Sequence, residues 1–195
     1  GGLEHLQPFV NFAGIPLDLN GFRDALAPPG IQNFDFGAPE TLAASIPAAN
    51  GVFDARSLAR MYAALGRGGE LDGVRILSRE TVAAATELQE PTRSRVVIPF
   101  DMRWRLGYHG AFTSRGRLPG AFGHFGFGGS GAWAHPESGM ALALVATSGL
   151  GTPFGDFRIA RLGAAAVACQ PERSPGAEPV AVDEVLGRAP SARTV

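Results

Sequence analysis

A glycine-rich run at positions 123–149, GHFGFGGSGAWAHPESGMALALVATSG, contains the residues of this sequence that are best suited to chemistry. It combines a serine, Ser130, with two histidines, His124 and His135. Serine and histidine together can carry out nucleophilic acyl transfer, whereas glycines between a strand and a helix can cradle phosphate groups. The run therefore allows three interpretations, which differ in the elements that must flank it.

The first interpretation is a dinucleotide-binding loop. Gly126, Gly128 and Gly131 match the G-x-G-x-x-G fingerprint. That fingerprint requires a helix after it, because the pyrophosphate lies at the helix N-terminus. The segment that follows, AWAHPESGMALALV, contains a turn and a strand-like run, which disfavours this interpretation. A Walker-type loop is excluded because the sequence contains no lysine.

The second interpretation is a nucleophile elbow formed by GGSGA at 128–132, as in α/β-hydrolases. An elbow joins a strand to a helix, and its acid and histidine follow later in the chain. The one histidine after Ser130 is His135, which is too near in sequence to fold back as an independent partner. On this interpretation Ser130 is the nucleophile, and otherwise it is a small residue in a glycine-rich strand.

Periodicity and turn signals predict the elements around this run. Apolar residues at helical spacing from Leu58 predict a helix that begins after Asp54. The segment ELDGVRIL predicts a hairpin around Asp72-Gly73, and Ser78 is placed to cap a second helix.

Strands are predicted at 96–108, 120–135 and 140–149, with a turn at HPESG before the last one. A final helix over 154–169 would pack on the sheet through Ile159, Leu162 and Ala166.

Two blocks together resemble a known family. PAANGVFDARSLARMYAALGRGGELDGVRILSRETV, followed by FGHFGFGGSGAWAHPESGMALALVATSG, resembles the C-terminal half of the β-lactamase-related serine hydrolases. That family groups class C β-lactamases, DD-peptidases and esterases. The resemblance covers about residues 45–168 and is most specific at 48–82 and 122–149.

The resemblance implies a third interpretation, in which the run is one wall of a serine-hydrolase site. His124-Phe125-Gly126 stands where the family carries Lys-Thr-Gly or His-x-Gly on an edge strand that lines the site. His124 would hydrogen-bond the substrate or tune the proton balance, and Phe127 would donate its backbone N–H to the oxyanion hole. The substrate-binding residues implied by the resemblance are Phe125, Gly126, Gly128 and Trp133.

The family's nucleophile motifs are missing from the sequence. Ser-x-x-Lys cannot occur without lysine, and neither Tyr62 nor Tyr108 lies in a Tyr-x-Asn context. We therefore expect an N-terminal segment outside this sequence to carry the nucleophile, and we expect the chain alone to be inactive on esters and amides. The alternative is a non-catalytic binding module on the same scaffold.

The fold class implied is α+β, the C-terminal part of a β-lactamase/transpeptidase-like fold in which a C-terminal helix packs on an antiparallel sheet. Residues 1–95 would belong to the helical domain and its connections. Residues 96–170 would supply sheet strands and the final helix, and 171–195 a flexible tail.

Composition and charge limit the kinds of partner that we expect for this chain. A net charge of −1 predicts no nucleic-acid partner, and no apolar run is long enough to cross a membrane. No signal peptide is visible, which leaves the compartment open, and the single cysteine, Cys169, excludes an internal disulfide. We expect a small ester or amide as substrate, with no cofactor and no metal.

Overall fold

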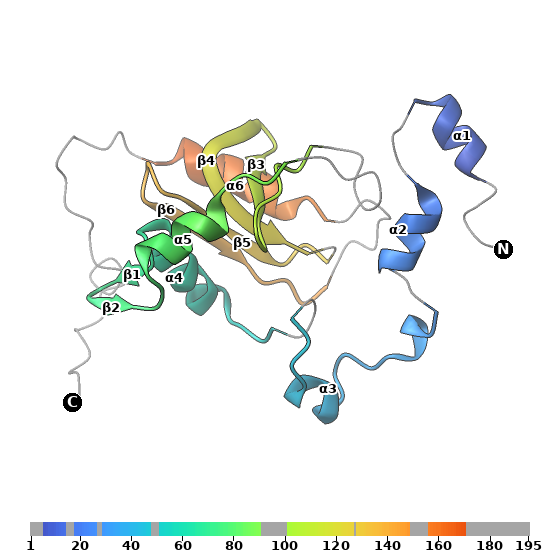
Figure 1. Cartoon of the computed structure of the whole chain (residues 1–195), viewed down its shortest axis with the longest axis horizontal. Coiled ribbons are helices and arrows are strands. Elements are labelled where there is room, and N and C mark those ends of the chain that lie inside the picture. Colours follow the sequence, from blue (N-terminus) through green and yellow to red (C-terminus); the bar gives the residue numbers. More distant parts are fainter. Residues whose placement is uncertain are drawn as a thin grey trace. The chain divides into compact units, whose positions relative to one another are not determined.

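The computed structural model describes residues 6–14, 18–26, 29–47, 51–90, 101–126, 128–148 and 156–170. Contacts divide the chain into two compact units, residues 1–54 with 84–110, and residues 55–83 with 111–195 (Figure 1). Among its described residues, the first unit includes the short helical segments α1 (Gln7–Phe12), α2 (Leu19–Leu26), η2 (Ile31–Asn33) and α3 (Pro39–Ala43). No helix among the described residues is long and apolar enough to span a membrane.

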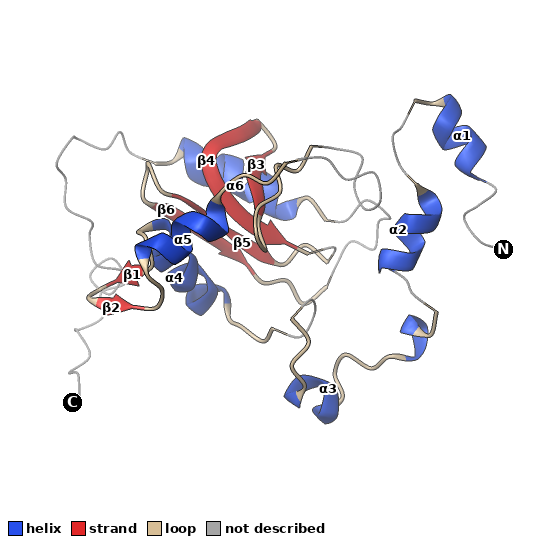
Figure 2. Cartoon of the chain, in the orientation of Figure 1, coloured by secondary structure: helices blue, strands red, loops and turns tan. Residues whose placement is uncertain are grey.

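The second unit is built around a four-stranded sheet in the order β3-β4-β5-β6 (Figure 2). Its strands are β3 (His109–Thr113), β4 (Gly116–Phe125), β5 (Gly131–His135) and β6 (Met140–Leu144). The helices are α4 (Ala55–Gly66), α5 (Arg79–Thr86) and α6 (Arg158–Ala168), and a small hairpin consists of β1 (Glu70–Leu71) and β2 (Val74–Arg75). The pairs β4–β5 and β5–β6 are antiparallel, so the unit combines helices with antiparallel strands as expected.

One face of the sheet is built from alanines. Successive side chains of a strand point to opposite faces, so Ala132 and Ala134 of β5 share a face, and both are fully buried. Their register partners on β6 are alanines as well. Helix α4 packs on this face so closely that a methyl group on Gly66 would lie 3.0 Å from the Ala134 Cβ.

The opposite face carries the large apolar core. Trp133, between the two alanines, is 1% exposed and clusters with Ala111, Ala121 and Ile159. Helix α6 covers this face, and Gly163 leaves room for the indole ring. Small residues on one face and a tryptophan on the other therefore set the distance of each helix from the sheet.

Several local predictions are confirmed. Helix α4 buries Tyr62 and Leu65 as its apolar periodicity predicted. Strands β1 and β2 form the expected hairpin, with positive φ at both Asp72 and Gly73. Ser78 caps α5, since its Oγ accepts the Thr81 N–H at 3.1 Å.

The prediction of a strand over 96–108 is wrong for the part that is described. Residues 102–108 form a loop, because Arg103 and Gly107 have φ of 52° and 82°, which no strand accommodates. Residues 96–100 lie outside the described part. The predicted single strand over 120–135 is two strands, β4 and β5, separated by a turn.

The packing face of the last helix also differs from the prediction. Leu162 is 49% exposed, whereas Ile159 and Gly163 are buried against the sheet. The helix is rotated toward Gly163 because a small residue is needed where the helix packs against the Trp133 indole ring. Helix α4 belongs to the same compact unit as the sheet. The division by contacts therefore does not coincide with the domain boundary that we expected at residue 95. The assignment of 1–95 to a helical domain stays a prediction.

Gly163→Ala should stabilise the chain. A Cβ at this position would lie 3.4 Å from Thr113 Cγ2 and 3.5 Å from Trp133 Cζ2, which is ordinary contact. Alanine is favoured over glycine inside a helix by about 1 kcal/mol. We expect the free energy of unfolding in urea to rise by about 0.5–1 kcal/mol. Gly163→Leu is the control, and it should destabilise because it collides with the indole; stabilisation by leucine would contradict this packing.

Candidate active site

His124 lies near the end of β4. It is the register partner of Ala132, so its side chain belongs to the alanine face of the sheet. Ala121 and Phe122 before it are buried, whereas His124 is exposed. Protein atoms around part of the ring limit its hydration, and this desolvation lowers the pKa of His124 below its usual value of 6.5. The imidazole is therefore neutral at neutral pH, with one nitrogen a donor and the other an acceptor.

The chain reverses direction after Phe125, the last residue of β4. The Gly126 N–H donates to the Ser130 carbonyl at 2.8 Å, and the Gly129 N–H donates to the Gly126 carbonyl at 2.9 Å. Gly129 has φ of 87°, a conformation that favours glycine. We call the described residues Gly126 and 128–130 the glycine turn. Because β5 follows it rather than a helix, the dinucleotide-binding interpretation is wrong.

The residues expected around His124 are only partly brought together. Gly126 and Gly128 lie in the glycine turn and are exposed. Phe125 is half-buried, and its ring packs against the core and lies 5.0 Å from the ring of Phe112 in a T-shaped contact. Phe127 lies outside the described residues.

One expectation about this site needs correction. Trp133 is buried beneath α6, on the face opposite His124, and so packs the core rather than the rim of a cleft. In the strand order β4 lies between β3 and β5, and its last residues, 122–125, pair with β5. Backbone groups for a ligand can come from this end of β4 and from the glycine turn, where the strand leaves the sheet.

Ser130 joins two segments of backbone. Its Oγ accepts the N–H of Ala146, which follows β6, at 2.9 Å. A strand rather than a helix follows Ser130, and this geometry does not match a nucleophile elbow. The serine thus extends the pairing of β5 and β6 beyond the last strand residues.

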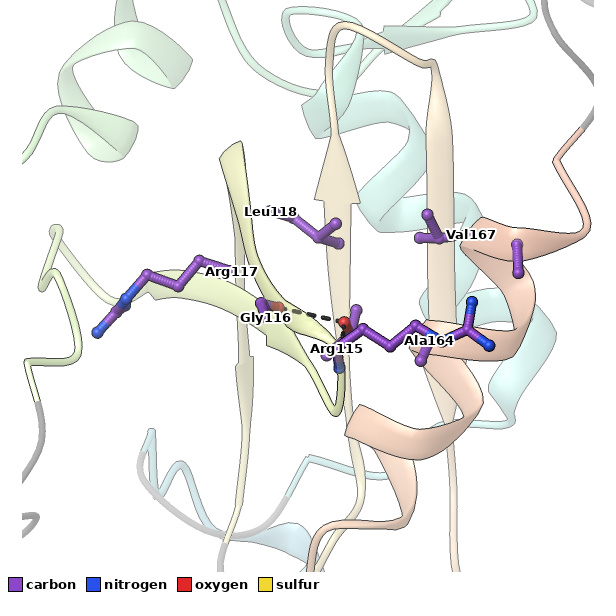
Figure 3. Close-up of a pocket in the computed structure, with 8 residues that line it drawn as sticks. Arg115, Gly116, Arg117, Leu118, Ala164 and Val167 are labelled. Carbon is purple, nitrogen blue, oxygen red and sulfur yellow. Dashed lines mark hydrogen bonds between the residues drawn. The ribbon is translucent and has the colours of Figure 1, made fainter.

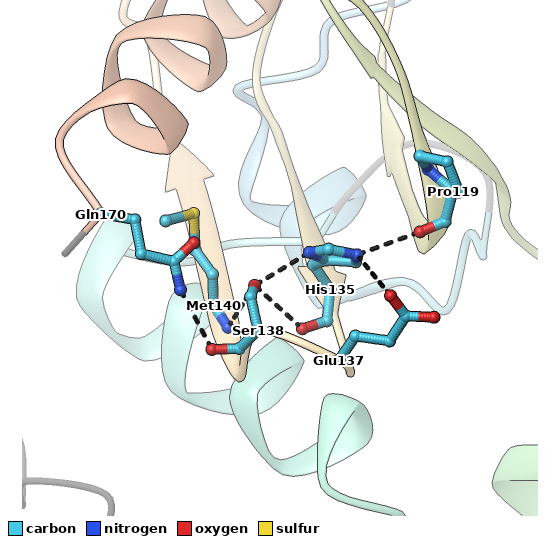
Figure 4. Close-up of polar contacts among 6 residues, drawn as sticks. All are labelled: Pro119, His135, Glu137, Ser138, Met140 and Gln170. Atoms are coloured by element: carbon cyan, nitrogen blue, oxygen red, sulfur yellow. Dashed lines mark hydrogen bonds and ion pairs between the residues drawn. The ribbon is translucent and has the colours of Figure 1, made fainter. Parts of the chain in front are cut away.

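His135 has a separate role in the turn between β5 and β6 (Figure 4). Its Nδ1 lies 2.8 Å from the Ser138 Oγ, and its Nε2 lies 3.0 Å from the Pro119 carbonyl oxygen. Glu137 is farther from the ring, 3.9 Å from Nε2. A histidine whose two nitrogens both have such partners is locked in place, so His135 connects the turn to β4 and is not a base for Ser130.

Asp156 and Arg158, just before and at the start of α6, were missed by the sequence analysis. The Asp156 carboxylate is buried, pairs with Arg158 and lies directly against Gly129 of the glycine turn. The one local signal was an aspartate next to a helix start, which is common at helix caps and does not by itself indicate a site.

A shallow pocket of about 160 Å³ lies elsewhere in this unit, between α6 and the connection from β3 to β4 (Figure 3). Arg115, Leu118 and Val167 help to line it, and it contains none of the candidate site residues. Within the described residues no cluster of three or more His, Cys, Asp or Glu side chains is arranged to hold a metal.

Ser130→Ala should cost stability by about 1 kcal/mol, because the Ala146 N–H loses its acceptor. Urea unfolding of the 195-residue chain measures this. Ser114→Ala, which removes an exposed hydroxyl from a turn, is the control and should change stability little. A loss of hydrolytic activity in Ser130→Ala that exceeds its loss of folded protein would restore the nucleophile interpretation.

The ring of His124 should titrate below pH 6.5, as followed by NMR of its Cε1 proton. Since the folded pKa lies below the unfolded one, the unfolded chain binds more protons between the two values. Folding stability should therefore fall as the pH drops through 6.5 and level off below the folded pKa. His124→Gln should remove this part of the pH dependence, and a midpoint at or above 6.5 would contradict the described environment.

Comparison with known proteins identifies the architecture. The family model described as Beta-lactamase matches residues 12–167. Esterase/beta-lactamase LipL of Mycobacterium tuberculosis is 47% identical over 128 residues, which cover 64% of this chain and 28% of that protein.

Two solved structures are also similar. A family VIII carboxylesterase has a TM-score of 0.62 and 34% identity, over 76% of this chain and 40% of the other. A penicillin-binding protein homolog from Caulobacter crescentus has a TM-score of 0.58 and 31% identity, over 74% of this chain and 39% of the other. The chain thus spans well under half the length of these relatives. With its α+β fold and the match over most of its length, the chain belongs to the β-lactamase family of serine hydrolases.

Proposed function

We propose that this chain supplies the His-x-Gly wall of a serine hydrolase that cleaves small esters or amides, and that the nucleophilic serine comes from residues outside it. The observation that carries the proposal is the position of His124 as the next-to-last residue of β4, two residues before Gly126 of the glycine turn, in a chain of this family. The names of LipL and of the carboxylesterase support an ester as substrate.

The reaction requires this wall to stabilise the negative charge that develops on the substrate oxygen. A serine Oγ attacks the substrate carbonyl, whose oxygen becomes negatively charged in the tetrahedral intermediate. A backbone N–H aimed at that oxygen lowers the barrier by about 3–4 kcal/mol. In our proposal the donor is the N–H of Phe127, next after the His124-Phe125-Gly126 triplet. Collapse of the intermediate releases the alcohol or amine, and water then hydrolyses the acyl-serine.

His124 meets the substrate as a neutral group. A lysine in its place would be a fixed cation, which suits substrates that carry a carboxylate close to the scissile bond. A neutral imidazole offers one donor and one acceptor without charge, which suits uncharged esters. This difference favours esterase activity over efficient hydrolysis of β-lactams.

The proton of the nucleophile needs a base that this sequence does not provide through the family's usual motif. All 17 basic residues other than histidine are arginines, and arginine stays protonated in proteins. We therefore place Ser-x-x-Lys in a segment outside these 195 residues.

Enzyme assays with and without such a segment test the proposal. The purified chain alone should give no burst of p-nitrophenolate from p-nitrophenyl butyrate and no labelling by a fluorescent penicillin. Co-expression with an N-terminal segment that carries Ser-x-x-Lys should yield a complex that hydrolyses the ester. Replacing the serine of that motif with alanine should abolish the activity.

His124→Ala in the active complex should lower kcat/KM about tenfold or more, the cost of a lost hydrogen bond of about 1–3 kcal/mol. His135→Gln is the matched control, because that histidine is held in the turn between β5 and β6 and should leave the rate nearly unchanged. Turnover by the chain alone would contradict the proposal that the nucleophilic serine lies outside this chain. A stable complex without turnover would favour the non-catalytic binding module.

A further inference from the structure

The buried carboxylate of Asp156 lies against the glycine turn. Asp156 is 3% exposed, and its Oδ2 accepts the Arg158 Nε–H at 2.8 Å and lies 2.6 Å from Arg158 Nη2. Its Oδ1 accepts the backbone N–H of Arg158 at 2.9 Å, at the first residue of α6. Both carboxylate oxygens are thus occupied, so the carboxylate is fixed relative to the helix.

Arg158 extends this arrangement to the chain after β6. Its Nη2 also donates to the Ser148 carbonyl. The guanidinium therefore connects Asp156 to the backbone that follows β6. Planar geometry with several donors suits arginine to such a bridge, and lysine could not reproduce all of the contacts. The hydrogen bond to Asp156 also raises the pKa of Arg158.

Gly129 makes the contact between this pair and the glycine turn. A Cβ on Gly129 would lie 2.6 Å from both Cβ and Cγ of Asp156, closer than real atoms approach. The Gly129 backbone therefore lies directly on the carboxyl group. From Gly129 a hydrogen bond leads to the Gly126 carbonyl, and Gly126 ends the triplet that begins with His124.

We propose that Asp156 and Arg158 are positioning residues that hold the glycine turn, and with it the His-x-Gly triplet, in the geometry needed for acyl transfer. The inference rests on the proposed function of that triplet. Removing Arg158 would leave a buried carboxylate without its charge partner, which a protein relieves by moving or protonating the group. Movement of Asp156 would release Gly129, and misplacement of a catalytic group by about 1 Å can cost 100-fold in rate.

Hydrogen exchange on the 195-residue chain tests the positioning without requiring activity. In Arg158→Met and Asp156→Asn, the amides of Gly126 and Gly129 should exchange at least about tenfold faster, while amides of α4 keep their rates. Arg161→Met, an exposed arginine on the same helix, is the matched control and should leave all of them unchanged. Arg158→Lys should recover part of the protection.

Kinetics of the complex that contains Ser-x-x-Lys test the consequence for the reaction. Arg158→Met should lower kcat about 10- to 100-fold and change KM less than threefold, and Arg158→Lys should recover part of the loss. Gly129→Ala provides a second route, because it keeps both charges and displaces the turn; its kcat should fall in the same way.

Two hydrogen-exchange results would overturn the inference. One is unchanged exchange at Gly126 and Gly129 in both pair variants, and the other is faster exchange spread evenly over the unit, which indicates general destabilisation. Wild-type kcat in Arg158→Met would also overturn it. If the wild-type complex hydrolyses nothing, the proposed function fails instead, and the exchange rates still decide whether the pair holds the turn.

Discussion

The alternation of small and large side chains along β5 is the constraint on which the rest of the sheet unit depends. Ala132 and Ala134 let α4 approach one face until Gly66 nearly contacts the strand, while Trp133 fills the space under α6 on the other. A one-residue slip of β5 would exchange these faces and place an indole against α4. The two helices therefore determine the register of the strands between them.

That register determines which face of the sheet carries the His124 side chain at the end of β4. Because His124 pairs with Ala132, its ring lies on the alanine face, away from the large core under Trp133. The chain then leaves the sheet through the glycine turn, whose far end is supported by the Asp156–Arg158 pair at the start of α6. Core packing, strand register and the buried ion pair thus all act on the glycine turn, which joins the sheet to the proposed site.

Local signals were sufficient for the parts of the fold that depend on neighbours in sequence. The periodicity from Leu58, the Asp72-Gly73 turn and the Ser78 cap all predicted what the structure contains. The glycines at 126–131 gave no such signal, because the sequence does not reveal which of several neighbouring glycines has positive φ, and the glycine turn was therefore predicted as continuous strand. The face of Trp133 and the partner of Asp156 depend on register and on contacts between distant segments, so they could not be predicted from local pattern.

The central claim is that the residue after the His124-Phe125-Gly126 triplet directs its N–H at an acyl group on a serine from outside this chain. A crystal structure of the active complex, inhibited by a phosphonate that mimics the tetrahedral intermediate, tests this directly. The account predicts the phosphonyl oxygen about 2.7–3.1 Å from the Phe127 nitrogen, with phosphorus bonded to the serine of Ser-x-x-Lys. Phosphorus bonded to Ser130, or an inhibitor bound away from the end of β4, would contradict it.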